Sequence, residues 1–263
     1  MPTPILIGIA GGSGSGKTYL AHQVQMEAVE EHVSVLSMDQ YFKTDGTGED
    51  PANINFDHPG RLNFGLMVSH IRRLKSGHAI TAPSYDFHKR VETAEAERIP
   101  ASPVVIVEGL FILAEPVVNL FDLTCFLDVA ADERLLGRIV RDTKERGATI
   151  ESIIDRYQRF VRPSYQVFVA PTAQNADVVV DFTYRRTLFT ALLVHVIRDY
   201  VTHNFDLNQL VTELRKEQFS LGFKPEEGSM PFSTDIFALA KAFPETSFPS
   251  VDGAQITARP KHK

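Results

Sequence analysis

The sequence predicts an α/β fold, a doubly wound and mainly parallel sheet of five strands. Three observations support this prediction: buried apolar runs, helical repeats that alternate with them, and a glycine-rich turn between the first run and the first helix. Apolar runs with little alternation are typical of parallel strands that helices cover on both faces. Strands and helices in alternation give a doubly wound sheet, whose ligands gather at the carboxyl ends of the strands.

Five apolar runs are the expected strands, and helical repeats separate them. The strands are residues 5–10, 33–38, 104–107, 125–129 and 178–180. The helices fall at about 17–31, 62–76, 131–146, 149–161 and 187–202. Between the second and third strands, residues 44–60 are loop-like and residues 78–100 alternate loosely around Pro83. This alternation favours a small β-hairpin laid over the sheet edge.

Composition and charge narrow the class of protein. The 263 residues are 43% hydrophobic and 23% charged, which is typical of a soluble globular chain. A net charge of −6 argues against a general nucleic-acid-binding surface, and no apolar run approaches the ~20 residues that span a bilayer. The N-terminus has no signal-peptide layout, and the single Cys125 is expected to be a buried strand residue rather than a nucleophile. We therefore expect a cytoplasmic protein without nucleic-acid or membrane partners.

A phosphate-binding loop is the most specific motif. Between the first strand and the first helix, the pattern G-x-x-x-x-G-K-[ST] is matched by Gly11, Gly12, Ser13, Gly14, Ser15, Gly16, Lys17 and Thr18. Glycines let backbone N–H groups turn toward phosphate oxygens, and the helix N-terminus adds positive potential. Lys17 is expected to reach the β- and γ-phosphates, and the Thr18 hydroxyl to ligate Mg²⁺. The motif predicts that the chain binds a nucleoside triphosphate.

Two carboxylates follow strands of the predicted sheet. Asp39 ends the second strand and Glu108 ends the third, so both are expected to face the triphosphate. Phosphoryl transfer needs a group that orients and deprotonates the attacking hydroxyl, and acidic ligands for Mg²⁺, direct or through water. Asp39 suits the first role and Glu108 the second. The alternative is that each residue caps the element that follows it.

Arginines recur on the helix expected at 131–146. Arg134, Arg138 and Arg141 share a face, and Arg146 follows near the helix end. Guanidinium groups bind phosphate oxygens bidentately and stabilise charge on a transferred group, so we interpret this segment as a lid over the triphosphate. The alternative is a solvated basic face that pairs with acidic neighbours on the same helix, namely Asp132, Glu133, Asp142 and Glu145.

Several motifs in order resemble the uridine–cytidine kinase family, within the wider uridine kinase and phosphoribulokinase group. They span residues 5–180 and comprise the phosphate loop, Ser37–Asp39, Asn55–Pro59, Tyr85–Phe87, Val107–Gly109, Arg138–Asp142, Glu145–Gly147 and Arg162–Pro163. The resemblance implies a kinase that uses ATP and Mg²⁺, in which Asp39 is the base that faces a sugar 5′-hydroxyl. It also implies that Thr18 and Glu108 serve Mg²⁺, and that Arg141 and Arg146 belong to the lid.

The resemblance also implies an acceptor site for a nucleoside. Asp57 would hold the ribose hydroxyls, and Tyr85 and Phe87 would line the base pocket, with Arg138 nearby. A carboxylate is a good acceptor for a vicinal diol, and aromatic faces stack on a planar base.

The chain departs from the family pattern at three base-reading positions. Arg90, Ala148 and Arg156 stand where family members usually have histidine, arginine and glutamine. Uridine or cytidine is the first expected acceptor. A phosphorylated sugar or another anionic small molecule is the second, because Arg90 and Arg156 add positive charge. A nucleotide-binding regulatory protein that has lost kinase activity is a third hypothesis, and the intact Lys17, Thr18, Asp39 and Glu108 argue against it.

The motifs divide the chain into a kinase domain and an extension. Residues 1–203 are expected to form the kinase domain, with a substrate-binding insertion at 44–100 and the lid at 131–148. The extension, residues 204–263, contains a plausible short helix at 206–219 and an apolar island at Ile236–Phe243. We expect its last ~15 residues to be poorly ordered. The sequence is compatible with a homo-oligomer.

Overall fold

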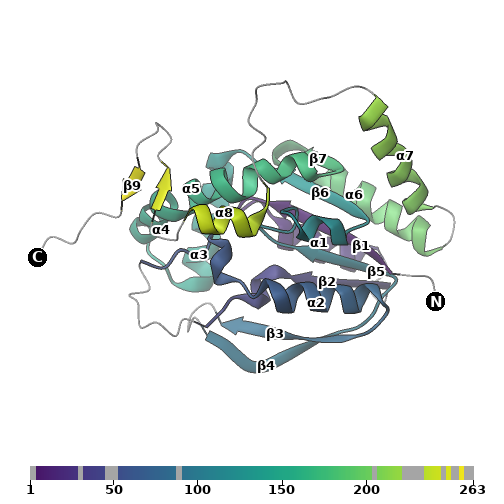
Figure 1. Ribbon diagram of the computed structural model, residues 1–263, viewed down its shortest axis with the longest axis horizontal. Coiled ribbons are helices and arrows are strands. Elements are labelled where there is room, and N and C mark those ends of the chain that lie inside the picture. The colour runs from purple at the N-terminus through teal and green to yellow at the C-terminus, as the bar shows by residue number, and fades with distance from the viewer. Residues whose placement is uncertain are drawn as a thin grey trace, which may run out of the picture.

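Five parallel strands form the central sheet of the computed structural model, which describes residues 4–28, 32–44, 53–86, 91–202, 206–220, 234–243, 247–249 and 255–257 (Figure 1). The strands are β1 (Ile5–Gly11), β2 (Val33–Ser37), β5 (Val104–Glu108), β6 (Leu123–Asp128) and β7 (Val178–Asp181). They lie in the order β2-β5-β1-β6-β7, and every neighbouring pair is parallel. The prediction of a doubly wound α/β sheet is confirmed.

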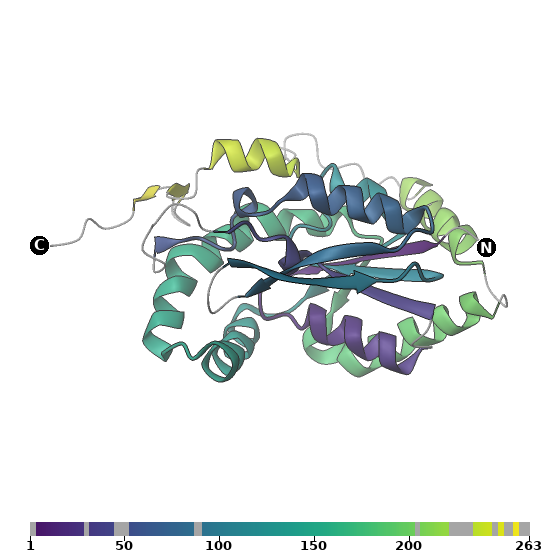
Figure 2. The same ribbon diagram turned by 90° about the horizontal axis from the view of Figure 1, so that it is seen from below.

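Strand side chains alternate between two apolar cores, one on each face of the sheet. Ile5, Ile7 and Ile9 pack on the face covered by α1 (Lys17–Glu27), α6 (Phe182–Val201) and α7 (Leu207–Ser220). Leu6 and Ala10 pack on the other face, under α2 (Phe64–Lys75) and α8 (Ile236–Ala242). Figure 2 shows the strands edge-on, with the blue α2 and the yellow α8 on one side and the purple α1 on the other. Because both faces are covered, the strands carry apolar residues at nearly every position.

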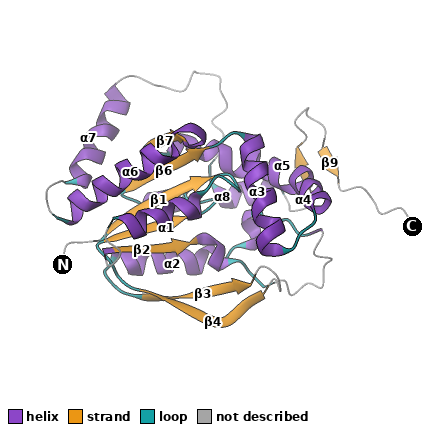
Figure 3. Ribbon diagram, turned by 180° about the vertical axis from the view of Figure 1, so that it is seen from behind, coloured by secondary structure: helices purple, strands orange, loops and turns teal. Residues whose placement is uncertain are grey.

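The helices between β6 and β7 lie beyond the carboxyl ends of the strands (Figure 3). They are α3 (Ala131–Arg146), α4 (Ile150–Arg156) and the single turn α5 (Arg162–Ser164). The helix expected at 149–161 continues further, since π-helical turns at Tyr157–Val161 and Tyr165–Val169 flank α5. Pro163 lies inside this helical run, at the point where the π-helical turn of Tyr157–Val161 gives way to α5.

Two helix boundaries differ from the sequence prediction. The helix expected to begin at 187 begins at Phe182, with a kink at Arg185, because its first turn follows β7 without a loop. Helix α1 ends at Glu27 rather than continuing, and Ala28 is its C-cap. Figure 3 shows α1 and α6 side by side in front of the strands.

The expected hairpin is present beside β2, at one edge of the sheet. It consists of β3 (Ile80–Asp86) and β4 (Val91–Ile99), which pair antiparallel with a register shift between Pro83 and Ser84. Ile80, Ala82 and Tyr85 of β3 are buried in the same core as α2. Short 3-10 helices at Met38–Tyr41, Pro59–Arg61 and Val117–Leu120 complete this side of the molecule.

Residues of the C-terminal extension pack on the rest of the chain. Leu207 of α7 and Ile236 of α8 are buried, each in a different core. Near the end of the chain, Gln255–Thr257 forms β9 and pairs antiparallel with β8 (Ser247–Pro249), and most of the last ~15 residues lie outside the described part of the chain. The composition of the last residues gives no sign of this local backbone pairing. None of the described helices combines the length and the apolarity that crossing a bilayer requires.

Candidate active site

The phosphate loop connects β1 to α1 in a conformation that only glycine adopts easily. Gly14 and Gly16 have φ values of 84° and 87°, and a Cβ on Gly14 would collide with the carbonyl oxygen of Arg134. No side chain caps α1, so the first N–H groups of this helix are directed at the loop. These features fit a cradle for phosphate oxygens.

Lys17 is the buried cation of this loop. Its ammonium group donates a hydrogen bond to the carbonyl oxygen of Gly12 at 3.0 Å, and the residue is 8% exposed. Burial lowers the pKa of Lys17, and the nearby carboxylates of Glu108 and Asp39 oppose this shift. An anionic phosphate placed here would supply a further counter-charge.

Thr18 and Glu108, the residues expected to serve the metal, are in contact. Thr18 Oγ1 donates to Glu108 Oε1 at 3.1 Å, and Ser37 Oγ donates to the same oxygen at 2.6 Å. The sheet register places Glu108 beside both Ile9 and Ser37, at the carboxyl ends of three strands. Burial raises the pKa of Glu108, and the neighbouring Asp39 raises it further.

The oxygen donors at this point fit Mg²⁺ only with help from a nucleotide. A hydroxyl and a carboxylate are the hard ligands that Mg²⁺ prefers. Within the described part of the chain, no three His, Cys, Asp or Glu residues cluster as a metal site. A Mg²⁺ ion held by Thr18 and Glu108 would therefore complete its octahedron with water and phosphate oxygens, as is common for this ion.

Asp39 faces the same cavity from the second strand. It lies in the first turn of the 3-10 helix that follows β2, where its N–H donates to Ser37 Oγ at 3.3 Å. The cavity has a volume of about 240 Å³, and Lys17, Thr18, Asp39 and Glu108 all line it. The structure thus brings together the four residues assigned to the donor side, although strands that are far apart in the sequence carry them.

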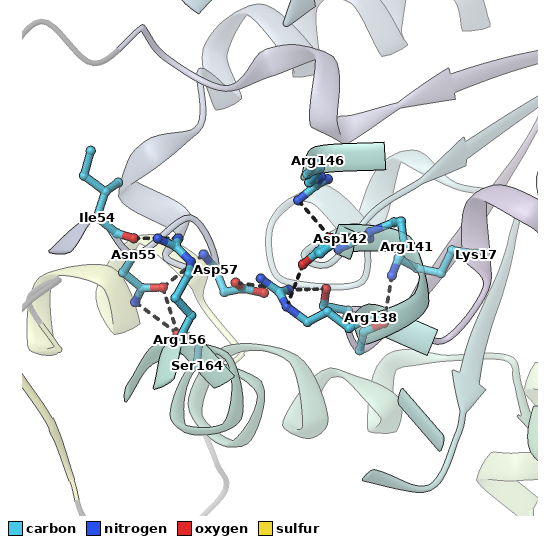
Figure 4. Close-up of polar contacts among 12 residues, drawn as sticks. Lys17, Ile54, Asn55, Asp57, Arg138, Arg141, Asp142, Arg146, Arg156 and Ser164 are labelled. Atoms are coloured by element: carbon cyan, nitrogen blue, oxygen red, sulfur yellow. Dashed lines mark hydrogen bonds and ion pairs between the residues drawn. The ribbon is translucent and has the colours of Figure 1, made fainter. Parts of the chain in front are cut away.

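Three arginines of α3 converge on one buried carboxylate (Figure 4). Asp142, 4% exposed, lies 3.2 Å from Arg138 Nε and 2.9 Å from Arg141 Nε. Its third contact is with Arg146 Nη1, at 3.5 Å. Burial would raise the pKa of Asp142, but the three guanidinium groups lower it on balance. With one negative charge for three positive ones, the cluster has charge left for phosphate oxygens.

The pKa values of the two outer arginines differ. Burial would lower the pKa of Arg141, but the charge and hydrogen bond of Asp142 raise it on balance. Burial lowers the pKa of Arg146, and the neighbouring charge of Arg141 lowers it further. Both side chains line the cavity and are about one-third exposed, 32% for Arg141 and 28% for Arg146.

Arg134, on the same helix face, has a different position. Its guanidinium group stacks on the Tyr165 ring, 3.7 Å from the centroid, and its Nε donates to the carbonyl oxygen of Val129. Neither of the two interpretations of the basic face describes the helix completely. Arg134 joins α3 to its neighbours, Arg138 pairs with the acidic Asp142, and all members of the Asp142 cluster line the cavity.

Asp57 also lines the cavity, close to Arg138 of α3. Its N–H donates to Asn55 Oδ1 at 3.0 Å, and Asn55 Nδ2 donates in turn to Ser164 Oγ of α5. Arg138 Nη1 lies 4.0 Å from Asp57 Oδ2 and donates to Ser13 Oγ at 2.8 Å. One guanidinium group therefore links the phosphate loop to residues 54–60, a segment that we call the acceptor loop.

Arg156 lines the cavity but is held against its wall. Its Nη2 donates to the carbonyl oxygen of Ile54 at 3.0 Å, and its guanidinium group lies 5.5 Å from the Phe56 ring centroid. Ala148 is also part of the lining. Its methyl group offers neither the charge nor the hydrogen bonds of the arginine usual in family members.

The predicted aromatic residues fall in different places. Tyr85 is buried behind the cavity, with its ring 5.5 Å from that of Phe42. Among the described residues, Phe42 and Phe56 supply the aromatic surface of the cavity. Phe87 and Arg90 lie outside the described residues.

Some residues of the site were not singled out from the sequence. Asp142 is recognisable only once three arginines are seen to surround it, and the sequence shows it as one of several acidic neighbours. Phe42 lies just after Asp39, and Phe56 precedes Asp57, so proximity to those carboxylates was the available signal. Ser37 belongs to one of the motifs quoted above, but its contact with Glu108 follows only from the strand register that places the two side by side.

A phosphate loop, two strand-end carboxylates and a guanidinium cluster around one cavity define a P-loop kinase. The family model described as "Phosphoribulokinase / Uridine kinase family" matches residues 6–188. A uridine kinase of Clostridium novyi is 34% identical over 207 residues, which cover 78% of this chain and 100% of that protein. A uridine kinase of Clostridium perfringens is 40% identical, covering 68% of this chain and 88% of its own.

Solved structures show the same fold at lower identity. A putative fructose transport system kinase from Silicibacter sp. TM1040 superposes with a TM-score of 0.56 at 19% identity, covering 68% of this chain and 91% of its own. Phosphoribulokinase from Rhodobacter spheroides gives a TM-score of 0.52 at 15% identity, and the superposition covers 67% of this chain and 69% of that protein. The chain belongs to the phosphoribulokinase and uridine kinase family, and it is a phosphotransferase that acts on a hydroxyl acceptor.

Proposed function

We propose that this protein transfers the γ-phosphoryl group of ATP to the 5′-hydroxyl of uridine or cytidine, with Mg²⁺. The observation that carries the proposal is one cavity lined by Lys17, by the arginine cluster and by two carboxylates, Asp39 and Asp57. The curated relatives named uridine kinase, at 34–40% identity, support the same acceptor.

The proposed reaction is an in-line transfer in which Asp39 handles the proton. The 5′-oxygen attacks the γ-phosphorus, the bond from that phosphorus to the β–γ bridging oxygen breaks, and ADP leaves. Asp39 accepts the proton of the hydroxyl as the new bond forms. Lys17, Arg141 and Arg146 stabilise the charge on the phosphate oxygens. Mg²⁺ would be held by Thr18 and Glu108, and it would supply charge neutralisation between the phosphates.

The charge balance of the cavity favours a neutral acceptor. Its lining includes five basic residues, Lys17, Arg138, Arg141, Arg146 and Arg156, and four acidic ones, Asp39, Asp57, Glu108 and Asp142. Most of the basic groups lie at the phosphate loop or on α3, where the triphosphate would use them. Asp57 and Arg156 are the charged residues on the acceptor side, and the Asp57 carboxylate suits a ribose diol better than an anion.

A second acceptor class rests on one observation. Arg156 is on the cavity wall where family members usually have glutamine, and an arginine there would attract a phosphorylated sugar. Its hydrogen bond to the Ile54 carbonyl, however, already directs the guanidinium group at the backbone of the acceptor loop. The neutral nucleoside therefore remains the first proposal.

An acceptor panel tests the proposal directly. Full-length protein with ATP and Mg²⁺ would be given nucleosides, pentose phosphates and simple sugars, and ADP release would be measured. We expect uridine or cytidine to raise the rate above the ATP-only background and Asp57→Asn to raise the KM of the nucleoside without changing that of ATP. ADP release with pentose phosphates and not with nucleosides would replace the first acceptor by the second. If none of the acceptors in the panel raises ADP release above the ATP-only background, both acceptor classes are contradicted.

A further inference from the structure

The acceptor loop is held in place by the C-terminal extension as well as by the kinase domain. His58, which directly follows Asp57, is 3% exposed and has its ring edge-on to Phe168, with centroids 5.1 Å apart. Its Nδ1 accepts a hydrogen bond from the N–H of Gly60 at 3.0 Å, and its Nε2 lies 2.8 Å from the carbonyl oxygen of Phe243. Phe243 is the C-cap of α8.

The two bonds of His58 fix its tautomer. Because the N–H of Gly60 donates to Nδ1, this nitrogen has no proton, so Nε2 carries the proton and donates to Phe243. A neutral ring thus connects the backbone of the acceptor loop to the end of α8. Loss of the Phe243 carbonyl would leave a buried N–H donor without that acceptor, an arrangement that proteins avoid.

Helix α8 is anchored well enough to serve as a support. Ile236 is fully buried in the core under α2, and its N–H donates to the carbonyl oxygen of Glu115 at 3.1 Å. The N–H of Glu115 donates to the carbonyl oxygen of Thr234 at 2.9 Å. Asp235 caps the helix by accepting from Phe237 N and Ala238 N. Figure 1 shows α8 lying across the body of the domain, although more than thirty residues separate it from α6.

This support lies outside the part of the chain that the family model matches. The match ends at residue 188, and α8 begins at Ile236. We propose that α8 is a positioning element for the acceptor site, and that the His58–Phe243 hydrogen bond transmits its docking to Asp57. The inference rests on the proposed function for the role of Asp57. The other side of the loop is held by Asn55 and Ser164, so the two supports enclose Asp57.

The first experiment measures the loop itself in full-length protein. Ile236→Ser places a hydroxyl in an apolar site and should release α8, whereas Lys241→Ser changes an exposed residue of the same helix. We expect backbone amides of residues 53–63 to exchange with deuterium at least about tenfold faster in Ile236→Ser and at the wild-type rate in Lys241→Ser. Exchange in this segment that is unaffected by Ile236→Ser would overturn the proposal. This readout needs no acceptor, so it remains valid if the proposed function fails.

The second experiment separates positioning from general destabilisation. His58→Asn retains a side-chain oxygen close to the position of Nδ1, but it is too short to reach Phe243. We expect it to raise the KM of the nucleoside by about tenfold and to leave the KM of ATP within about twofold of wild type. Combined with Ile236→Ser, it should add little, because both changes break the same connection. Equal increases in both KM values, or fully additive effects, would overturn the proposal.

Discussion

Replacement of Asp142 by asparagine should destabilise the protein and slow the reaction together. The carboxylate is 4% exposed, and guanidinium nitrogens of Arg138, Arg141 and Arg146 lie within 3.5 Å of it. Asp142→Asn removes the negative charge and leaves the largely buried Arg138 without its nearest counter-charge. Breaking a buried ion pair from one side costs about 3–5 kcal/mol, and the partial exposure of the outer arginines places this variant near 3 kcal/mol.

That cost can be measured as a change in melting temperature. For a chain of this size, about 3 kcal/mol corresponds to a fall in Tm of roughly 6–12 °C. Turnover should fall about 100-fold, because the guanidinium groups are no longer fixed where charge develops on the phosphate. Differential scanning fluorimetry and steady-state kinetics would give both values. Glu145→Gln is the matched control, because it removes the same charge from an exposed position of the same helix.

The pH dependence of the effect has a definite sign. Because the folded-state pKa of Asp142 is lower than its ordinary value, its stabilising contribution is complete above the unfolded pKa of about 4 and is lost as pH falls through the folded pKa. The Tm difference between wild type and Asp142→Asn should therefore be full at pH 7 and shrink below about pH 4. If the Tm of Asp142→Asn at pH 7 equals that of the wild type or that of Glu145→Gln, the reasoning is refuted.

Two further substitutions test other parts of the site, and a labelling experiment tests the core. Asp39→Asn should lower kcat by about 100-fold or more and leave the KM of ATP within about twofold, and unchanged turnover would remove Asp39 from the role of base. Gly14→Ala should abolish ATP-dependent thermal stabilisation, because its Cβ would collide with Arg134, whereas Gly77→Ala, at φ 76° with open space around it, should cost only about 1 kcal/mol. Burial raises the pKa of the Cys125 thiol to about 12, so a thiol reagent at pH 8 should label it only in denaturant; labelling of the folded protein would contradict its burial.

The sequence predicts the framework of this fold because its strands and helices follow strong local patterns. All five strands were located, since the runs from Ile5 to Ala10 and from Val104 to Val107 are apolar on both faces. The helix that begins at Phe182 was placed too late, because its first turn directly follows a strand without a cap or a turn residue to mark it. The register between Ser37 and Glu108 is a long-range property, and nothing local specifies it.

The donor side of the site was predictable for a similar reason. The phosphate loop is contiguous, and the strand-end rule places Asp39 and Glu108 near it. The acceptor side is assembled from distant segments, such as Asn55 with Ser164, so no spacing in the sequence reveals it. Tyr85 shows the limit of motif reasoning: it lies in the expected strand, yet it packs behind Phe42 rather than on the cavity wall.

The close seating of α3 on the phosphate loop limits how a lid could move. Gly14 approaches both Arg134 and Gly137 of this helix, and the Arg134 guanidinium group is stacked on Tyr165. A rigid rotation of the whole segment 131–148 would break these contacts and distort the loop that holds the nucleotide. If segment 131–148 acts as a lid, its pivot would lie beyond Arg138, whose side chain donates a hydrogen bond to Ser13 of the phosphate loop, and the moving part would be the end of α3 that carries Arg141 and Arg146. Opening and closing would then change the contacts of Arg141 and Arg146 with the γ-phosphate, while the phosphate loop keeps its conformation.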